Sequence, residues 1–256
     1  MLEIMKPIIH LFAGLMLVSL FTHCNKDSAR TDSSNQTAGA GGSTARFTIA
    51  GNYLYTVDHS SLKSFLITNP NQPVFKSKTD IGINIETIFP YQDKLFIGSS
   101  SSMCIFSLTN PDKPHLVGSA TYQIRMSCDP VVVKDNAAYA TLRADGPCGW
   151  GMSSLVVYDV SSLSSPVLKT TLPLTSPYGL GVTGNALYVC DGENGLAIFD
   201  VSDPYVPNRV SEIHDKTFYD VIPYDNILIC QVSDGFALYD IGTDPLNPVF
   251  ISNVLN

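Results

Sequence analysis

The sequence predicts an all-β fold assembled from five copies of one four-stranded antiparallel sheet. A proline that precedes an apolar stretch returns with separations of 41, 52, 41 and 41 residues, a period typical of repeat architectures. Each copy holds four short segments rich in β-branched and aromatic residues and bounded by Gly, Asn, Asp or Pro. No long helical periodicity occurs after residue 24. The repeated prolines are Pro73, Pro114, Pro166, Pro207 and Pro248.

A single sheet of this kind cannot bury both of its faces. Five such sheets arranged radially bury one another's faces and leave only short edges, which is the arrangement of a β-propeller. We therefore expect residues 45–256 to form one β-propeller domain of five blades. Its closure would rest either on blade packing alone or on the segment before Arg46, and the sequence leaves both alternatives open.

The N-terminus predicts export. Residues 1–23 combine Lys6 with an uncharged apolar run of about 15 residues, which matches a secretory signal and falls short of the roughly 20 residues of a spanning helix. The stretch ending at Cys24 resembles a bacterial lipoprotein signal, whose cysteine becomes the lipidated first residue. His23 departs from the small residue usual before that cysteine, and ordinary secretion is the alternative. We expect a lipid-anchored protein of the bacterial cell envelope, on its periplasmic or surface face.

Residues 24–44 predict a flexible tether, because Ser, Thr, Gly, Ala, Asn and Gln dominate there and apolar residues are few. Such a segment would hold a folded body just off a membrane. The membrane, reached through the N-terminal lipid anchor, is therefore one expected partner.

The charge balance excludes one class of partner. The chain carries 15 Lys and Arg against 23 Asp and Glu, a formal net charge of −8. Nucleic acid binding depends on basic residues that neutralise phosphates, so we do not expect a nucleic acid ligand. The acidic residues are scattered, and we interpret them as solvated surface.

The copies resemble a known bacterial repeat. The fourth copy reads LYVCDGENGLAIFDVSDPYVP over Leu187 to Pro207, and the first, second and fifth copies follow the pattern in degraded form. This is similar to the LVIVD repeat, whose consensus runs approximately LYVAD and then GLxIxDVSDPxxP. The resemblance covers about residues 46–256 and implies a β-propeller in an exported protein. No defined biochemical activity comes with this family.

Several recurrent polar residues have a structural interpretation. The residue before proline initiates a turn in four copies, and Asp58 and Asp191 each close a second strand at a hairpin. The sequence DGENG at 191–195 superficially resembles a calcium loop, but it stands where a hairpin turn is required, and we interpret it as that turn. The residues before proline are Asn69, Asn110, Asp203 and Asp244.

No constellation predicts a metal or a cofactor. The three histidines after residue 24 fall at different places in their repeats, so no shared metal ring is expected. The chain also lacks HExxH, a paired CxxC, a glycine-rich phosphate loop and a nucleophile elbow. We therefore predict no metal, no cofactor and no catalytic residues.

The cysteines predict one disulfide and several packed thiols. The third copy is 11 residues longer than the others, and Cys128 and Cys148 lie near strand ends within it. In an exported protein these two are expected to pair, with two separate thiols as the alternative. Cys190 and Cys230 are assigned to one repeated strand position, which indicates buried packing, and we expect the same of Cys104.

The candidate ligand site follows from the innermost strands, whose entry loops line the channel mouth of a propeller. If the first segment of each copy is innermost, one repeated position carries Glu86, Asp129, Tyr178 and Phe218. Two carboxylates beside two aromatic rings suit a cationic or sugar-like ligand, whereas the alternative is a polar rim with packing aromatics. Neighbouring residues extend this candidate face: Arg125, Arg143, Trp150, Tyr219 and Asp220.

Three functions are compatible with these features. The leading hypothesis is a non-catalytic binding or scaffold module on the cell envelope, with a protein or glycan ligand. The second is an enzyme acting on glycans, with Glu86 and Asp129 as an acid/base pair. The third is a purely structural envelope protein.

Overall fold

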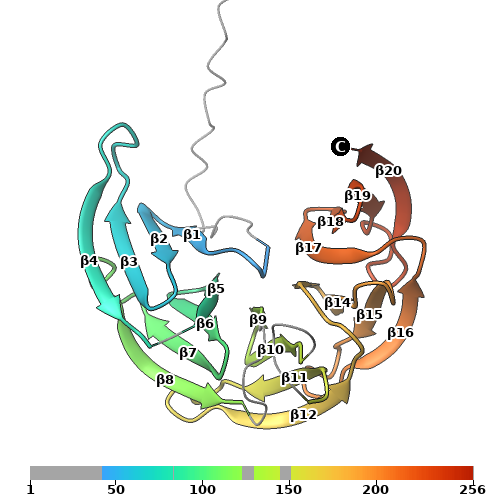
Figure 1. Ribbon diagram of the computed structural model, residues 1–256, viewed down its shortest axis with the longest axis horizontal. Coiled ribbons are helices and arrows are strands. Elements are labelled where there is room, and N and C mark those ends of the chain that lie inside the picture. Colours follow the sequence, from blue (N-terminus) through green and yellow to red (C-terminus); the bar gives the residue numbers. More distant parts are fainter. Residues whose placement is uncertain (1–41, 83, 123–129, 145–150, 256) are drawn as a thin grey trace, which may run out of the picture. The chain divides into compact units, whose positions relative to one another are not determined.

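The computed structural model describes residues 42–82, 84–122, 130–144 and 151–255. Within these ranges the chain forms five four-stranded antiparallel sheets, all in the compact unit Gln36–Asn256 (Figure 1). The predicted all-β propeller of five four-stranded blades is thus confirmed. Over the same ranges no helix has the length and apolar character needed to cross a membrane.

Each blade is a run of four consecutive strands. Blade 1 contains β1 (Phe47–Ala50), β2 (Tyr53–Val57), β3 (Ser61–Leu66) and β4 (Val74–Asp80). Blade 2 contains β5 (Ile85–Tyr91), β6 (Lys94–Ser99), β7 (Ser102–Ser107) and β8 (His115–Thr121). Blade 3 contains β9 (Val131–Lys134), β10 (Ala137–Leu142), β11 (Ser154–Asp159) and β12 (Val167–Pro173). Blade 4 contains β13 (Leu180–Thr183), β14 (Ala186–Cys190), β15 (Leu196–Asp200) and β16 (Asn208–Ile213). Blade 5 contains β17 (Phe218–Tyr224), β18 (Ile227–Val232), β19 (Gly235–Asp240) and β20 (Val249–Leu255).

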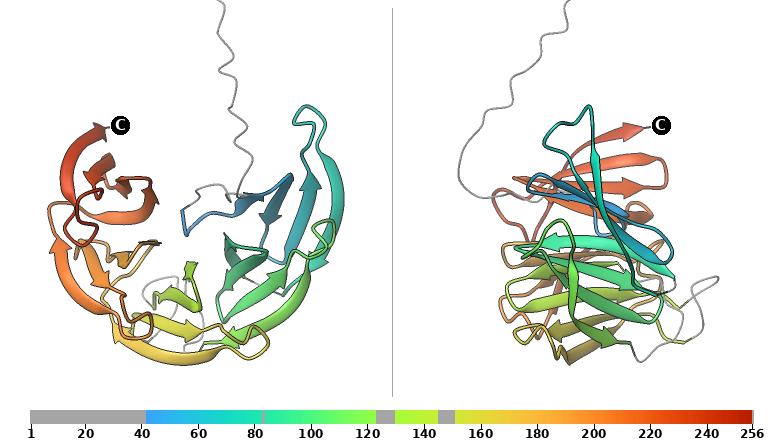
Figure 2. Two further views of the ribbon diagram at one scale, coloured as in Figure 1. Left: turned by 180° about the vertical axis from the view of Figure 1, so that it is seen from behind. Right: turned by 90° about the vertical axis from the view of Figure 1, so that its left-hand side faces the viewer.

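The first strand of every blade is innermost. Consecutive first strands contact one another from β1 through β5, β9 and β13 to β17. The fourth strands form the outer edge of the five blades, as Figure 1 and the view from behind in Figure 2 show. This arrangement confirms the condition on which the candidate channel-mouth residues were chosen.

The turn between the first and second strands sets the register of each blade. In every copy one residue of this turn adopts a positive φ, which glycine accepts most easily and Asn or Asp tolerate. The carbonyl of the next residue then accepts a hydrogen bond from the residue after the third strand, as Asn185 does from Val201 and Asn226 from Ile241. The residues with positive φ are Gly51, Gln92, Asp135, Gly184 and Asp225.

These turns correct the alignment of the fifth copy by one residue. Its second strand is Ile227–Val232, and matching Asn226 to Asn185 places Cys230 opposite Val189 in the alignment and Gln231 opposite Cys190. The prediction that Cys190 and Cys230 share one strand position is therefore wrong. Both are nevertheless buried free thiols, which confirms that they serve as packing residues. Cys104 is half-buried and packs against the core between blades 1 and 2.

The hydrophobic core of the described residues consists of four clusters, one between each pair of consecutive blades. Between blades 4 and 5, for example, Tyr188 and Ile198 pack with Leu228 and Tyr239. No fifth cluster of described residues joins blade 5 to blade 1, and Figure 1 shows these two blades apart. The blades therefore bury four of the five face pairs that a closed ring of five would bury.

Hydrogen bonds from one blade to the next repeat at three of these contacts. A second-strand tyrosine donates its hydroxyl to the carbonyl of the first proline in the PxxP connection of the next blade. A fourth-strand hydroxyl donates to the carbonyl one residue later. The tyrosine pairs are Tyr55 with Pro111 at 3.1 Å, Tyr139 with Pro204 at 3.0 Å and Tyr188 with Pro245 at 2.7 Å. The others are Ser77 with Asp112, Thr170 with Tyr205 and Ser211 with Leu246.

The contact between blades 2 and 3 is built differently. Phe96 replaces the tyrosine, and the third copy has Leu163 where the others have the first proline of this connection. The fourth-strand position is Gly118, and a Cβ added there would lie 1.6 Å from the carbonyl oxygen of Leu163. The missing side chain thus allows a closer approach of the two backbones than a serine would permit.

The polar turn residues have the structural roles that the sequence indicates. Before the prolines, the side chains of Asn69, Asp203 and Asp244 each accept a hydrogen bond from the backbone N–H two residues later. In the DGENG turn, the Asp191 N–H donates to the Gly195 carbonyl at 2.8 Å, as a hairpin turn requires. Both interpretations are confirmed.

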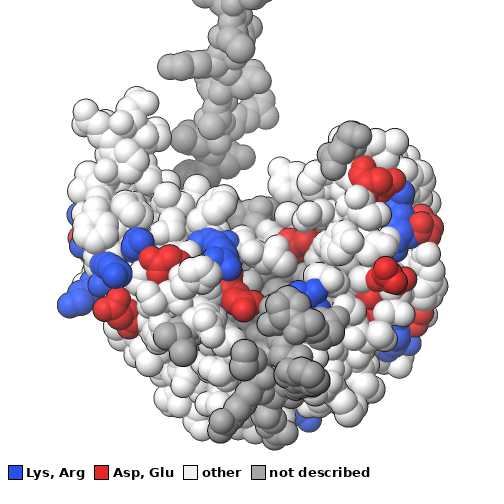
Figure 3. Space-filling model, viewed as in Figure 1, with Lys and Arg blue, Asp and Glu red and all other residues white. Residues whose placement is uncertain are grey.

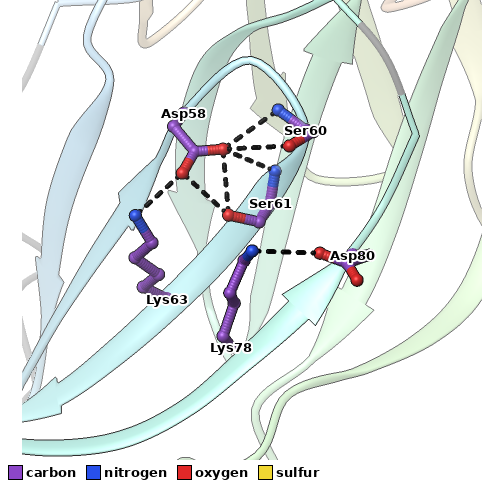
Figure 4. A network of polar contacts seen from close by, with 6 residues as sticks. All are labelled: Asp58, Ser60, Ser61, Lys63, Lys78 and Asp80. Carbon is purple, nitrogen blue, oxygen red and sulfur yellow. Dashed lines mark hydrogen bonds and ion pairs between the residues drawn. The ribbon is translucent and has the colours of Figure 1, made fainter.

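Asp58 closes the hairpin between β2 and β3 (Figure 4). Its Oδ1 accepts hydrogen bonds from the backbone N–H groups of Ser60 and Ser61, and its Oδ2 lies 2.8 Å from the Lys63 ammonium. The hydrogen bond from Lys63, followed by that from Ser60, holds the pKa of Asp58 well below its usual range. Lys63 is thereby fixed on a face of blade 1 that no other blade covers.

Candidate functional site

Three of the predicted site residues lie together at the entrance to the inner strands of blades 3 to 5. Arg143, directly after β10, places its guanidinium carbon 4.0 Å from the centre of the Tyr178 ring. Tyr219 of β17 meets the same ring edge to face, with 5.2 Å between the ring centres and an angle of 86°. A guanidinium and two rings in this arrangement form a rigid aromatic wall with a positive charge beside it.

A hollow of about 380 Å³ is bounded by the two tyrosines and by polar loop residues. The other residues around it are Thr175, Ser176, Gly192, Glu193, Asn194 and Thr217. A neighbouring hollow of about 340 Å³ shares Glu193 and Thr217 and continues over His214, Asp215, Lys216, Ser233 and Asp234. The two hollows join an aromatic wall to a polar surface that offers both donors and acceptors.

The floor of the first hollow is held by Asp191. Its side chain is buried and accepts hydrogen bonds from the backbone N–H groups of Thr175 and Ser176 at 3.1 and 2.7 Å. Burial raises the pKa of this carboxyl, and the two backbone hydrogen bonds oppose the rise. Asp191 therefore positions the loop before β13 and is not presented to a ligand.

The carboxylate of Asp220 is also engaged in structural hydrogen bonds. It accepts hydrogen bonds from the Thr44 hydroxyl at 2.7 Å, from the Ser43 hydroxyl at 3.4 Å and from the Val221 N–H at 2.9 Å. Two glycines leave room for its carboxylate, since a Cβ on Gly42 or Gly179 would lie 2.2 or 2.1 Å from its oxygens. Asp220 thus anchors the chain that leads into blade 1.

The segment before Arg46 contributes to the closure of the propeller. Ser43 is buried and accepts a hydrogen bond from the Leu180 N–H at 2.8 Å, while Thr44 reaches Asp220. Residues 42–44 therefore lie against β13 and β17, and they connect blade 1 to blades 4 and 5 near the centre. The ends of the arc are joined by this segment and not by a shared sheet.

We expect the Asp220→Asn variant to change how stability depends on pH. Burial raises the pKa of Asp220, so its contribution to folding is fully present below about 3.9, the ordinary value of an aspartate, and is lost as pH rises through the higher folded pKa. The difference in free energy of unfolding between wild type and variant should therefore shift in favour of the variant between pH 4 and pH 7. Urea titrations at both pH values measure it, and Asp191, present in both proteins, cancels.

An unchanged difference between pH 4 and pH 7 would show that Asp220 has an ordinary pKa in the folded protein. The Asp80→Asn variant serves as the control, because the side chain of Asp80 is 83% exposed.

Phe218 requires a correction as a candidate site residue. Its side chain is 0% exposed and packs in the core between blades 4 and 5. The one-residue offset of the fifth copy explains the error, since the position equivalent to Tyr178 is Tyr219 once the turns are aligned. The repeated aromatic pair at the channel mouth is therefore Tyr178 and Tyr219.

The remaining predictions divide into two groups. Glu86 is a half-buried residue of β5, in blade 2. Asp129, Arg125, Trp150, Cys24 and the pair Cys128 and Cys148 lie outside the described residues, so the acid/base pair, the lipidation and the disulfide stay predictions. Within the described ranges no cluster of His, Cys, Asp and Glu is arranged to hold a metal ion.

A larger hollow of about 490 Å³ lies between blades 1 and 2, at the turns that connect first to second strands. Both of its tyrosine hydroxyls already serve the contact between these blades, because that of Tyr53 donates to Asp112 at 2.6 Å and that of Tyr55 to Pro111. We therefore favour the Tyr178 and Tyr219 hollow as the functional site.

The polar partners in that hollow were not predicted. Asn194 and Thr217 belong to hairpin and strand-entry loops whose sequence signals only a turn. The DGENG turn beside the end of β14 was a clue to a loop at this place, and it carries no information on which side chains face the channel. Figure 3 shows Lys and Arg interspersed with Asp and Glu over one face of the protein, without an extended patch of one sign.

Comparison with solved structures finds proteins of the same fold. A functionally unknown protein from Desulfotomaculum acetoxidans is 13% identical, with a TM-score of 0.63 over 80% of this chain and 67% of that one. A protein from Lactobacillus plantarum is 12% identical, with a TM-score of 0.65 over 81% and 74%. BamB from Moraxella catarrhalis is 12% identical, with a TM-score of 0.53 over 82% of this chain and 60% of BamB. At these identities the likeness shows the fold alone.

Sequence comparison finds a family. No curated protein matches the chain. The model of the LVIVD repeat matches residues 41–80, 150–172 and 179–215, which fall in the first, third and fourth copies. The matched segments coincide with blades whose turns and interblade hydrogen bonds repeat, and these three segments of the chain are LVIVD repeats.

Proposed function

We propose that this β-propeller is a non-catalytic binding module of the bacterial cell envelope, with its ligand in the hollow beside Tyr178 and Tyr219. The observation that carries the proposal is the rigid pair of tyrosine rings, backed by Arg143 and bordered by polar loop residues. Binding sites are typically concave, with aromatic walls and a few placed polar groups. A purely structural protein has no need of such a hollow.

A glycan is the ligand class that this surface suits best. The apolar face of a sugar ring packs on an aromatic ring, and its hydroxyl groups exchange hydrogen bonds with amide, hydroxyl and carboxylate groups. Tyr178 and Tyr219 supply the rings, while Asn194, Thr217 and Glu193 supply the polar partners. The protein would meet such a ligand at the envelope, to which the signal (1–23) would direct it and where the lipid anchor at Cys24 would hold it. Of the predicted tether (24–44), residues 42–44 pack against β13 and β17, so only the part before them would act as a tether.

The Tyr219→Ala variant should weaken ligand binding by about tenfold or more, because truncating a central aromatic residue in a binding site commonly costs at least 1.4 kcal/mol. The measurement is a screen of the full chain against immobilised envelope glycans, followed by titration of the best binder. Tyr224→Ala is the matched control, since Tyr224 lies on the same strand, is 54% exposed and borders neither hollow.

Two outcomes count against the proposal. Equal binding by wild type and Tyr219→Ala would show that the ligand does not bind in the hollow. Release of a cleaved product from the bound glycan would replace a binding module with an enzyme.

A further inference from the structure

The face of blade 5 that is turned away from blade 4 is apolar, like the faces that other blades cover. One row across its strands consists of Ile222, Ile229, Leu238 and Ser252. The matching row of blade 4 is Gly181, Tyr188, Ile198 and Ser211, and that row packs against blade 5. Around the blade 5 row, Phe236 and Val254 are 43% and 55% exposed.

The face of blade 1 that is turned away from blade 2 is also apolar, like the faces on which a preceding blade packs. Its row is Ile49, Leu54, Phe65 and Phe75, and Ile49 and Phe75 are 42% and 57% exposed. In the next blades the two central residues of the matching row are buried by the blade before them, whereas the fourth-strand residues Leu116 and Phe250, which match Phe75, stay 54% and 48% exposed. Those central pairs are Leu95 with Phe106, Ala138 with Tyr158, Leu187 with Phe199 and Leu228 with Tyr239.

The two faces also match where they depart from the apolar pattern. Gln231 stands at the position of Cys190, and Cys190 packs in one cluster with Cys230 across the contact between blades 4 and 5. On blade 1 the position of Cys230 is Thr56, which pairs across the strands with Lys63. A contact of the same geometry would therefore place Gln231 beside Thr56 and Lys63, polar against polar.

Ser252 retains the donor of the interblade hydrogen bond. It occupies the position of Ser77, Thr170 and Ser211, each of which donates to the carbonyl one residue after the first PxxP proline of the next blade. The corresponding carbonyl of blade 1 is that of Asn71, in an exposed loop. Donor and acceptor are thus both present at the two ends of the arc.

We infer that blade 5 of one molecule packs on blade 1 of a second copy of this chain, in a head-to-tail contact that continues the series of blade contacts within the chain. Each copy carries both complementary faces, which is the condition for a heterologous interface. Within one chain, residues 42–44 fix the entry to blade 1 against β13 and β17, and blades 1 and 5 stay apart in Figures 1 and 2. A second copy is therefore the occupant that fits both faces.

The test uses two variants of the full chain, Phe236→Lys on blade 5 and Phe75→Lys on blade 1. The two side chains are 43% and 57% exposed, so each variant should keep the circular dichroism spectrum of the wild type. Sedimentation equilibrium in density-matched detergent should show concentration-dependent association of the wild type, and neither variant alone should associate. An equimolar mixture of the two should form a one-to-one dimer and nothing larger, because one intact contact remains.

Val206→Lys is the control, since Val206 is 61% exposed in a loop of blade 4 and should associate like the wild type. Three results would overturn the inference. A wild type that sediments as a monomer at every concentration favours closure within the chain or another partner. Association of Phe75→Lys alone points to a contact between two copies of blade 5. A mixture that fails to dimerise excludes the head-to-tail arrangement.

Discussion

Replacement of Tyr188 by alanine is expected to lower the free energy of unfolding by about 3–5 kcal/mol, the cost typical of removing a large buried aromatic side chain. Tyr188 is fully buried in the core between blades 4 and 5, and its hydroxyl donates to the Pro245 carbonyl at 2.7 Å. The Tyr188→Phe variant keeps the ring and loses the hydrogen bond, so it should cost only about 1 kcal/mol. Urea unfolding followed by circular dichroism measures both changes.

The comparison of these two variants separates packing from hydrogen bonding in one interblade contact. Tyr224→Ala is the control, because this tyrosine is exposed and its removal should change stability by less than about 0.5 kcal/mol. If Tyr188→Ala and Tyr224→Ala proved equally mild, blade 5 would not depend on this contact for its stability.

Gly118→Ser should destabilise the protein even though serine occupies this position in three of the other blades. A Cβ on Gly118 would lie 1.6 Å from the Leu163 carbonyl oxygen and 2.6 Å from its carbon, both backbone atoms that cannot rotate away. Separating blades 2 and 3 enough to admit the side chain should cost about 1–3 kcal/mol or more, the range for overpacking a close contact. The midpoint of urea unfolding reports the loss.

Ser119→Ala on the same strand provides the control, since Ser119 is exposed. A Gly118→Ser protein as stable as the wild type would mean that the fold tolerates a wider spacing between blades 2 and 3.

The blade count and the strand pattern could be predicted because proline spacing and short apolar segments are properties of each copy alone. The register of the fifth copy could not, because its apolar residues Ile227 to Cys230 can be matched to the other copies in two ways. Only the backbone decides between them, through the positive φ of Asp225 where the fourth copy has Gly184. Because of that one-residue offset, the sequence assigns Phe218 to the repeated channel-mouth position that Tyr219 occupies in the structure.

The composition of the candidate site was predictable only in part. Tyr178 and Arg143 were found because the first strand was assumed to be innermost, and the structure places them in contact. The use of Asp220 by Ser43 and Thr44 could not be foreseen, since the two partners lie more than 170 residues away in the sequence. Long-range pairing of this kind leaves no local signal in either segment.

The attachment of residues 42–44 to β13 and β17 has a mechanical consequence. A pull on the chain from its N-terminal side does not peel β1 from its sheet first, because the load enters the body at Asp220 and Leu180. Blades 4 and 5 share that load along three hydrogen bonds, two to Asp220 and one from Leu180, before it reaches blade 1. The segment therefore protects the pairing of β1 with β2 from tension that is applied along the N-terminal chain.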